Sequence, residues 1–282
     1  MAFQKCRLGA DRLSSEPTQR PAEQPYPPGA NVFHDIWLAF ANPSRVFYNL
    51  PRINRSTTAL VILLLVLGTL GHLTTRTGVY AYEVKREANR AAFAYQKSHE
   101  GDDDPNAANA MAESIEKGSE FQVILNRLIA VFGKPLWTLC VVGLVGGFLF
   151  VAVALSGGKP KMSLLTGIVV FASFVQVPHA ALRLYLTGLT KHTRVETSAA
   201  AFPTQLGGEH GVSLGGYIGL RRLNPFDIWF WALMYLGLRK GARMTLRGAG
   251  ASLAVMLFFD LVWQSGLDYA ELAKQPPPGQ EA

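Results

Sequence analysis

Long apolar runs, separated by turns and charged segments, dominate the chain after residue 56. A transmembrane helix needs about 20 predominantly apolar residues to cross about 30 Å of hydrocarbon. The runs approach or reach that length, which predicts an all-α, polytopic membrane protein with about five transmembrane helices. The expected spans cover residues 57–75, 135–155, 162–182, 223–238 and 248–267.

The fourth run is the shortest. Its sixteen residues, 223–238, reach only about 24 Å as a helix. Arg221-Arg222 precede it, and Arg239-Lys240 follow it. Long basic side chains can extend from a short helix to the lipid headgroups, so we still expect a span here. In the second run, Gly143 and Gly147 have the spacing that permits close helix approach.

The segment 76–134 between the first two runs is charged but nearly neutral, with eight Lys and Arg against nine Asp and Glu. Residues 80–98 read as a charged helix, and the Gly-Asp-Asp-Asp-Pro stretch at 101–105 breaks it. A second helix carries apolar residues spaced four, three and four apart. We therefore expect a helical hairpin outside the membrane. The spaced residues are Phe121, Leu125, Leu128 and Phe132.

The two ends of the chain differ from the segment that enters the first run. Residues 1–30 are polar and rich in proline, and 268–282 contain three consecutive prolines, so both are expected to be disordered. Residues 31–56 predict two short amphipathic helices, the first capped by Asn31 and the second starting at Pro43. These helices either lie in the bilayer interface or pack on the protein's own spans.

The composition supports a membrane protein and argues against several other classes. Hydrophobic residues make up 49% of the chain and charged residues 17%, below the quarter or so of soluble domains. The net charge of +7 suits basic cytoplasmic loops, and no nucleic-acid-binding motif accompanies it. The sequence has no P-loop, no HExxH and no GxSxG motif, and no His pair at ligand spacing. We expect no enzyme, no metal, no cofactor and no nucleic-acid partner.

Short basic turns predict the orientation, because positive charge in short loops favours the cytoplasmic side. The turn 239–247 contains four Lys and Arg, and the turn 156–161 contains Lys159 and Lys161. With five spans, both turns lie on the side of the N-terminus. The N-terminus is therefore expected in the cytoplasm and the C-terminus outside, although Arg221-Arg222 fall on the outer side.

Ionisable residues within spans are candidates for function. Asp260 lies in the last run, where it would serve as an ion or proton site, or hydrogen-bond His179 or Ser173 on a facing span. His179 follows Pro178, whose ring should kink the third span. Asp227 lies near the start of the fourth run, where it would also interact with the helix N-terminus.

Four features of the chain resemble the Yip domain family, the Ypt/Rab-interacting membrane proteins and their bacterial relatives. The entry segment 37–47 reads WLAFANPSRVF, the third run ends in a Val-Pro stretch, and the fourth opens LNPFDIW and reaches Gly-Leu. The order of five spans with a cytoplasmic N-terminus also agrees. The residues that carry the resemblance are Pro43, Phe47, Pro178, Pro225, Phe226, Trp229 and Gly237.

The resemblance covers roughly residues 32–267 and implies a multi-pass protein of a bacterial inner membrane. Eukaryotic members bind small GTPases and one another, whereas no general activity is established for the bacterial relatives. The leading hypothesis is a non-enzymatic membrane protein that binds lipids, partner membrane proteins or further copies of itself, as a scaffold or accessory subunit. The alternative is a small permease or channel component that uses Asp260 and the kink at Pro178-His179. An intramembrane enzyme is a third, unsupported reading.

Overall fold

The computed structural model describes residues 31–52, 55–98, 105–155, 161–191, 195, 197–199, 220 and 223–272. Throughout these residues the regular structure is helical, without strands. The expected tail 1–30 lies outside the described residues. The helices are α1 (Val32–Ala41), α2 (Pro43–Asn49), η1 (Leu50–Arg52), α3 (Ser56–Arg76), α4 (Val79–Ser98), α5 (Pro105–Leu128), η2 (Ile129–Gly133), α6 (Lys134–Leu155), α7 (Met162–Ser173), α8 (Gln176–Thr190), α11 (Pro225–Leu236), η3 (Gly237–Gly241) and α12 (Leu246–Leu272).

Three helical segments are long and apolar enough to cross a membrane: Ser56–Arg76, Glu113–Leu155 and Met162–Thr190. The second has 43 residues and a length of about 65 Å, twice the hydrocarbon thickness, so part of it must project beyond a bilayer. The three long apolar segments favour an integral membrane protein. α11 with η3, and α12, are the shorter or less apolar counterparts of the fourth and fifth predicted spans. α12 continues to Leu272, past the predicted end at 267.

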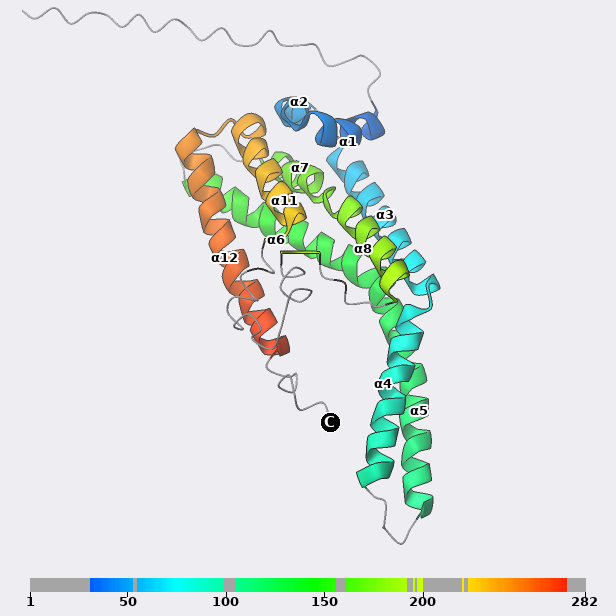
Figure 1. Ribbon diagram of the computed structural model, residues 1–282. Helices are drawn as coiled ribbons and strands as arrows, with labels where there is room; N and C mark the ends of the chain where they lie inside the picture. The colour runs from blue at the N-terminus through cyan, green and yellow to red at the C-terminus, as the bar shows by residue number, and fades with distance from the viewer. Residues whose placement is uncertain are drawn as a thin grey trace, which may run out of the picture.

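α7, the first half of the third long segment, lies at the centre of the bundle, whereas α8 is largely exposed or half-buried. Every residue from Gly167 to Val175 is buried. α7 packs against α6, α3 and α11, and it runs between them in Figure 1. A helix that is apolar and buried on all sides belongs in the interior of a bundle. The outer helices are therefore positioned around α7.

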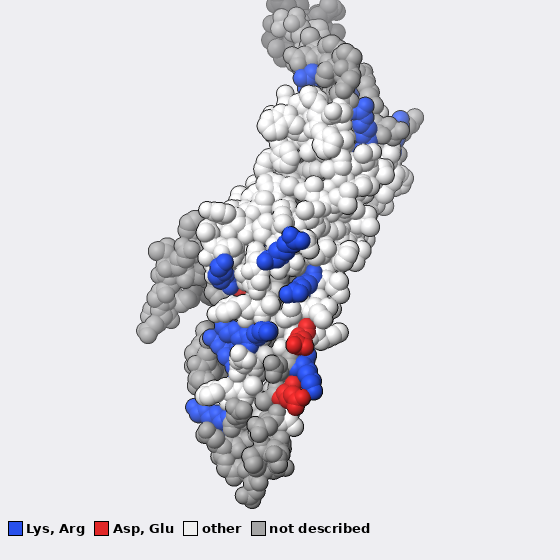
Figure 2. All heavy atoms as spheres, turned by 90° about the vertical axis from the view of Figure 1, so that its right-hand side faces the viewer, with Lys and Arg blue, Asp and Glu red and all other residues white. Residues whose placement is uncertain are grey.

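The outer helices leave many large apolar side chains exposed. A soluble protein rarely exposes a continuous apolar surface of this kind. Figure 2 views the side of the molecule on which α3 lies. It shows a band free of Lys, Arg, Asp and Glu, between basic side chains at the α1–α2 end and charged side chains toward the hairpin. On α3 the uncharged stretch runs from Ser56 to Thr75, which is about 30 Å of helix. The exposed residues include Val61, Leu65, Leu144, Val151, Leu155, Phe258, Leu261 and Val262.

The predicted break in the third span is present, one turn before Pro178. The helix is interrupted at Phe174 and Val175, between α7 and α8. Pro178 has no N–H to donate to the carbonyl of Phe174 four residues earlier. The Val177 amide donates to that carbonyl instead, at 3.0 Å. The proline therefore changes the hydrogen bonding of the helical turn that precedes it.

The segment between the first two spans forms two packed helices. α4 and α5 lie side by side and extend away from the bundle in Figure 1. Val84 of α4 and Val123 of α5 are buried. The π-helical turn η2 then joins α5 to α6, where the sequence pattern had predicted an uninterrupted α-helical stripe through Phe132.

α1 and α2 pack against the end of the helical bundle. The Asn31 side chain caps α1 by accepting from the His34 amide, and Pro43 opens α2. Leu38 and Phe47 are buried. α2 contacts η3, and α1 contacts α3 and α7, so the two helices cover one end of the bundle (Figure 1).

Asp35 of α1 is a buried carboxylate at this end. It is 0% exposed, and neither carboxylate oxygen accepts a hydrogen bond from a residue that the structure describes. Its ion-pair partner is Arg55, with an N–O distance of 3.9 Å. Burial raises the pKa of the Asp35 carboxyl above its ordinary 3.8, and the positive charge of Arg55 partly offsets this rise.

Because the pKa of Asp35 is raised in the folded state, its contribution to stability is complete below about pH 4 and is lost as the pH rises through the folded pKa. Asp35→Asn should therefore abolish one pH-dependent loss of stability above pH 4. Thermal unfolding in detergent across this range measures the effect. Arg55→Gln should enlarge the loss, and parallel profiles for wild type and Asp35→Asn would contradict the assignment.

Candidate functional site

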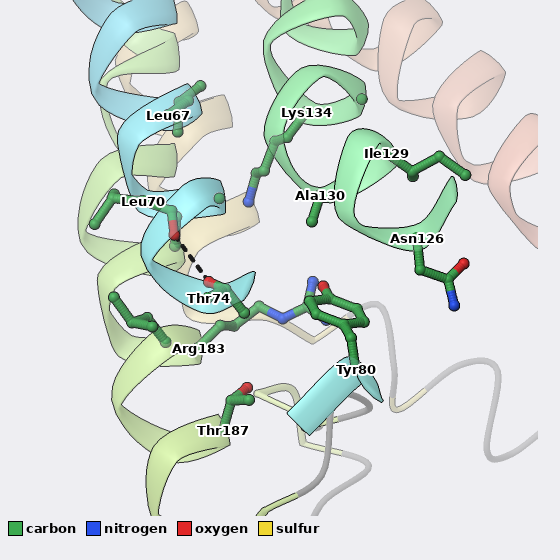
Figure 3. A pocket seen from close by; sticks show the side chains of 14 residues that line it. Leu67, Leu70, Thr74, Tyr80, Asn126, Ile129, Ala130, Lys134, Arg183 and Thr187 are labelled. Carbon is green, nitrogen blue, oxygen red and sulfur yellow. Dashed lines mark hydrogen bonds between the residues drawn. The ribbon is translucent and has the colours of Figure 1, made fainter. Parts of the chain in front are cut away.

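A cavity of about 320 Å³ lies at the end of the bundle from which the hairpin projects. Its walls come from α3, the first turn of α4, the α5–η2–α6 junction and α8 (Figure 3). One part of the wall is apolar and the other is polar and cationic. The lining residues are Leu67, Leu70, Gly71, Thr74, Tyr80, Asn126, Ile129, Ala130, Gly133, Lys134, Ala180, Arg183, Leu184 and Thr187.

Lys134 and Arg183 provide the positive charge. Lys134 begins α6, and Arg183 lies one turn beyond His179 on α8. Figure 3 shows both side chains extending into the space between α3 and η2. Because α6 and the α7–α8 segment form an antiparallel pair, the start of one and the end of the other meet at the same end of the bundle.

Charged side chains of both signs act on the residues that line the site. The charge of Arg183 opposes that of Lys134, and the carboxylate of Asp227 acts on Lys134 with the opposite sign. Neither cation forms a hydrogen bond or an ion pair with any residue that the structure describes. Glu83 lies near the same cavity and acts on Tyr80, but neither Asp227 nor Glu83 forms an ion pair with Lys134 or Arg183. Such an arrangement can bind an anion.

Tyr80 lies at the edge of the cavity in the first turn of α4 (Figure 3). Burial raises the pKa of the Tyr80 phenol, whereas the nearby Arg183 lowers it and Glu83 raises it. The net shift is upward, so the phenol is protonated at neutral pH. Its hydroxyl can donate a hydrogen bond to an acceptor in the cavity.

The close approach of α3 to η2 forms the floor of the cavity. A Cβ atom on Gly71 would collide with the carbonyl oxygen of Ala130 in η2. Glycine therefore lets the two backbones come together, and the π-helical turn sets the position of Lys134, which follows it directly. Gly143 and Gly147, the predicted close-approach pair, do not play this role, since a Cβ on either would meet nothing within 4 Å.

Two of the three predicted polar residues lie near this cavity without lining it. His179 is held by its Nε2, 2.9 Å from the Thr197 hydroxyl, and by stacking on Phe226, with ring centroids 4.8 Å apart. The charges of Lys134 and Arg183 both act on it. Asp227, next to Phe226, interacts with Lys134. The structure thus gathers α8 and the start of α11 beside the two cations.

Asp260 lies elsewhere, on α12, and is half-buried. The two partners predicted for it are engaged with other groups. The Ser173 hydroxyl donates to the Val169 carbonyl at 2.8 Å, and His179 pairs with Thr197. The neighbouring Phe259 packs edge-on against Phe148 of α6, at 5.6 Å between ring centroids. The hydrogen bond from Asp260 to His179 or Ser173 stays a prediction.

The residues that carry the family resemblance have packing roles. Pro43 and Pro225 occupy the first turns of α2 and α11, where a missing N–H costs nothing. Phe47 is fully buried. Trp229 meets Phe40 edge-on, at 5.5 Å between ring centroids.

Gly237 completes this packing, because a Cβ there would collide with the Ile168 side chain of α7. Gly237 is the first residue of the π-helical turn η3, which α2 contacts. Together with Phe47 and Trp229, it joins the α1–α2 layer, α7 and α11. Pro178 shapes α8, and Phe226 supports His179, as described above.

No family model matches the chain, and searches of curated proteins and solved structures found no match either. The resemblance to the Yip domain family therefore stays a prediction. Within the described residues, no group of three or more His, Cys, Asp and Glu side chains is placed to hold a metal ion.

Sequence reasoning did not identify Lys134 and Arg183 as a pair. Lys134 is one of the eight cations of segment 76–134, and Arg183 directly follows the predicted span 162–182. The available signal was topological: a cation at the start of the second span and one at the end of the third must lie on the same side of the membrane. Topology does not give the distance between Lys134 and Arg183 in the plane of the membrane, because the packing of α3 against η2 determines that distance.

Gly71→Ala should destabilise the protein, because the added methyl group meets the Ala130 carbonyl and overpacking costs about 1–3 kcal/mol. Gly143→Ala is the matched control, since its methyl group meets nothing within 4 Å. The measurement is the midpoint of thermal unfolding in detergent. Equal midpoints for the two variants would contradict the close approach of α3 and η2.

Proposed function

We propose that this chain is a five-span, non-enzymatic integral membrane protein that binds membrane lipid in the cavity lined by Lys134 and Arg183. In this role it serves as a scaffold or accessory subunit. The observation that supports the proposal is the position of two cations beside an apolar wall, at the end of an uncharged helical band. Such a site suits an amphiphile, whose chains lie in the band while its polar group meets the cations.

The proposed topology adds α11 with η3, and α12, to the three long apolar helices. α3, α6, α7–α8, α11 and α12 alternate in direction in Figure 1, as five successive crossings require. α1, α2 and η3 lie at one end of the bundle, and the α4–α5 hairpin projects at the other. We place the first end in the cytoplasm and the hairpin outside. The bacterial inner membrane follows from the proposed Yip domain resemblance.

The cavity lies at the outer boundary of this proposed bilayer. Arg55 precedes α3, and Arg76 ends it, so these two residues mark the limits of the uncharged band. Thr74 of the cavity is two residues before Arg76, and Tyr80 is four residues after it. A lipid headgroup from the outer leaflet would reach this level, with its chains beside α3 and η2.

Protein partners remain part of the proposal. The hairpin exposes Phe93 and Phe121, each 68% exposed, outside the uncharged band. Aromatic side chains of this kind are enriched at protein interfaces. A partner membrane protein or a second copy of the chain would cover them.

The permease alternative gains no support from the described geometry. Neither Asp260 nor Pro178-His179 lines the cavity. A transport path through Asp260 stays a prediction.

Single cysteines should report the proposed topology, once Cys6 and Cys140 are replaced by alanine. Lys117→Cys, on the hairpin, should react with a membrane-impermeant maleimide in intact cells, because it lies outside. Lys161→Cys and Arg247→Cys should react only after the inner membrane is permeabilised, because both lie at the cytoplasmic end. Reaction of all three on the same side would exclude the five-span arrangement.

Ala180→Phe should displace the proposed lipid, because Ala180 lines the cavity and the larger ring would fill it. Ala181→Phe is the matched control, since its neighbouring position is exposed and does not line the cavity. Native mass spectrometry after mild detergent extraction should find bound lipid on the wild type and on Ala181→Phe, and much less on Ala180→Phe. Equal lipid retention by all three proteins would refute binding in this cavity.

A further inference from the structure

We infer that the cavity selects lipids whose phosphate group carries a net negative charge, with Arg183 and Lys134 holding the phosphate oxygens. The inference rests on the proposed lipid-binding function and names the class of ligand for that site. Phosphatidylglycerol is a lipid of this class, whereas phosphatidylcholine carries a compensating cation. The selection follows from the hydrogen-bond donors, the two cations without ion-pair partners and the shape of the cavity.

The two cations are complementary in how they bind phosphate. The planar guanidinium of Arg183 can donate two parallel hydrogen bonds to two oxygens of one phosphate group. The Lys134 ammonium acts as a compact point charge with three donors. Both extend into the same space (Figure 3). Neither forms a hydrogen bond or an ion pair with a residue that the structure describes. Both are therefore available to an external anion.

The hydroxyl groups of the cavity are not equivalent. The Thr74 hydroxyl already donates to the Leu70 carbonyl at 2.9 Å, the contact drawn in Figure 3. It cannot donate the same proton to a ligand. The Tyr80 phenol and the Thr187 hydroxyl donate to no residue that the structure describes. These two groups are the neutral donors left for phosphate oxygens.

The two cations favour an anionic lipid over a zwitterionic one. Lys134 and Arg183 carry two positive charges, and neither of the carboxylates that act on this site, Asp227 and Glu83, forms an ion pair with them. The phosphate of an anionic lipid can form those pairs. A zwitterionic lipid would place its own cation near Arg183, where like charges repel.

The shape of the cavity favours a lipid headgroup over free phosphate. A volume of about 320 Å³ is at the lower end of the volumes of small-molecule sites, which suits a phosphate and its glycerol rather than two acyl chains as well. The apolar lining includes Leu67 and Leu70 of α3 and Ile129 of η2, on either side of Lys134 (Figure 3). Ile129 is 57% exposed, so the apolar wall continues onto the outer surface of the bundle. The acyl chains would follow that surface.

Binding to the detergent-solubilised full chain, measured by native mass spectrometry, tests the inference. The ligands are short-chain phosphatidylglycerol, phosphatidylcholine with the same chains, and inorganic phosphate. Phosphatidylglycerol should bind about tenfold more tightly than phosphatidylcholine, as expected for a charge-assisted pair. Inorganic phosphate should bind weakly and should not displace it. If inorganic phosphate bound as tightly as phosphatidylglycerol and displaced it, the ligand would be a soluble anion.

Charge-neutralising variants then assign the preference to the two cations. Lys134→Gln and Arg183→Gln should each bring phosphatidylglycerol affinity to within about twofold of phosphatidylcholine affinity. Arg183→Lys should retain part of the preference, because it keeps the charge but loses the fork geometry. Lys191→Gln is the matched control: it removes an exposed cation that follows α8 and does not line the cavity. Its preference should equal that of the wild type.

Two failures of the test differ in meaning. If both lipids bind equally and Ala180→Phe blocks both, the cavity binds lipid without selecting its charge, and the inference is overturned while the proposed function stands. If neither lipid binds, both the inference and the proposed function are overturned. The unfolding midpoints of the variants show whether a lost preference reflects misfolding, and Arg183→Lys keeps the test valid if either glutamine variant does not fold.

Discussion

The exclusion of charge from a helical band about 30 Å long is the constraint on which the rest of the structure depends. On α3 this band runs from just after Arg55 to just before Arg76, and α6 and α7 with α8 contain no Lys, Arg, Asp or Glu over their predicted spans. Charged residues must therefore gather at the ends of the spans. Antiparallel helices then bring together cations that are far apart in the sequence. Lys134 and Arg183 are neighbours for this reason.

Within such a band, apolar burial gives helices little reason to associate, because lipid chains are as apolar as leucine. Close backbone approach has to supply the packing. Gly71 provides it where α3 meets η2, and Gly237 provides it where η3 meets α7. Both contacts involve a π-helical turn. These turns are often found at functional sites, and η2 lies directly beside the cavity.

Much of the fold could be predicted from local sequence patterns. The apolar runs predicted the three long helices, and Asn31 and Pro43 marked the starts of α1 and α2, because capping depends on residues three or four apart. The π-helical turns could not be predicted, since the stripe through Phe132 fits an ordinary helix as well. The spacing of Gly143 and Gly147 also predicted close helix packing there. Spacing alone does not reveal which face of α6 has a neighbouring helix.

The cavity could not be predicted from local sequence patterns. Tyr80, Lys134 and Arg183 are separated by about fifty residues each, and only the packing of α3, η2 and α8 brings them together. Topology predicts that Lys134 and Arg183 share one end of the bundle. It does not predict that they lack partners there, which depends on where Asp227 lies. The burial of Asp35 was missed for the same reason, since its helix was expected to present polar residues outward.

Tyr80 gives the cavity a place in the architecture as a whole. It belongs to the first turn of α4, so the cavity lies at the joint between the bundle and the projecting hairpin. α4 contacts α3 much less extensively than it contacts α5, so the hairpin is joined to the bundle mainly through α5, which continues through η2 into α6. A phosphate held by Tyr80, Lys134 and Arg183 would connect the hairpin, α6 and α8 through one group. Such a ligand stabilises whichever hairpin position lets all three residues reach it, because binding favours the conformation with the higher affinity. A lipid in this cavity would thereby link the composition of the outer leaflet to the orientation of the hairpin's exposed aromatic surface.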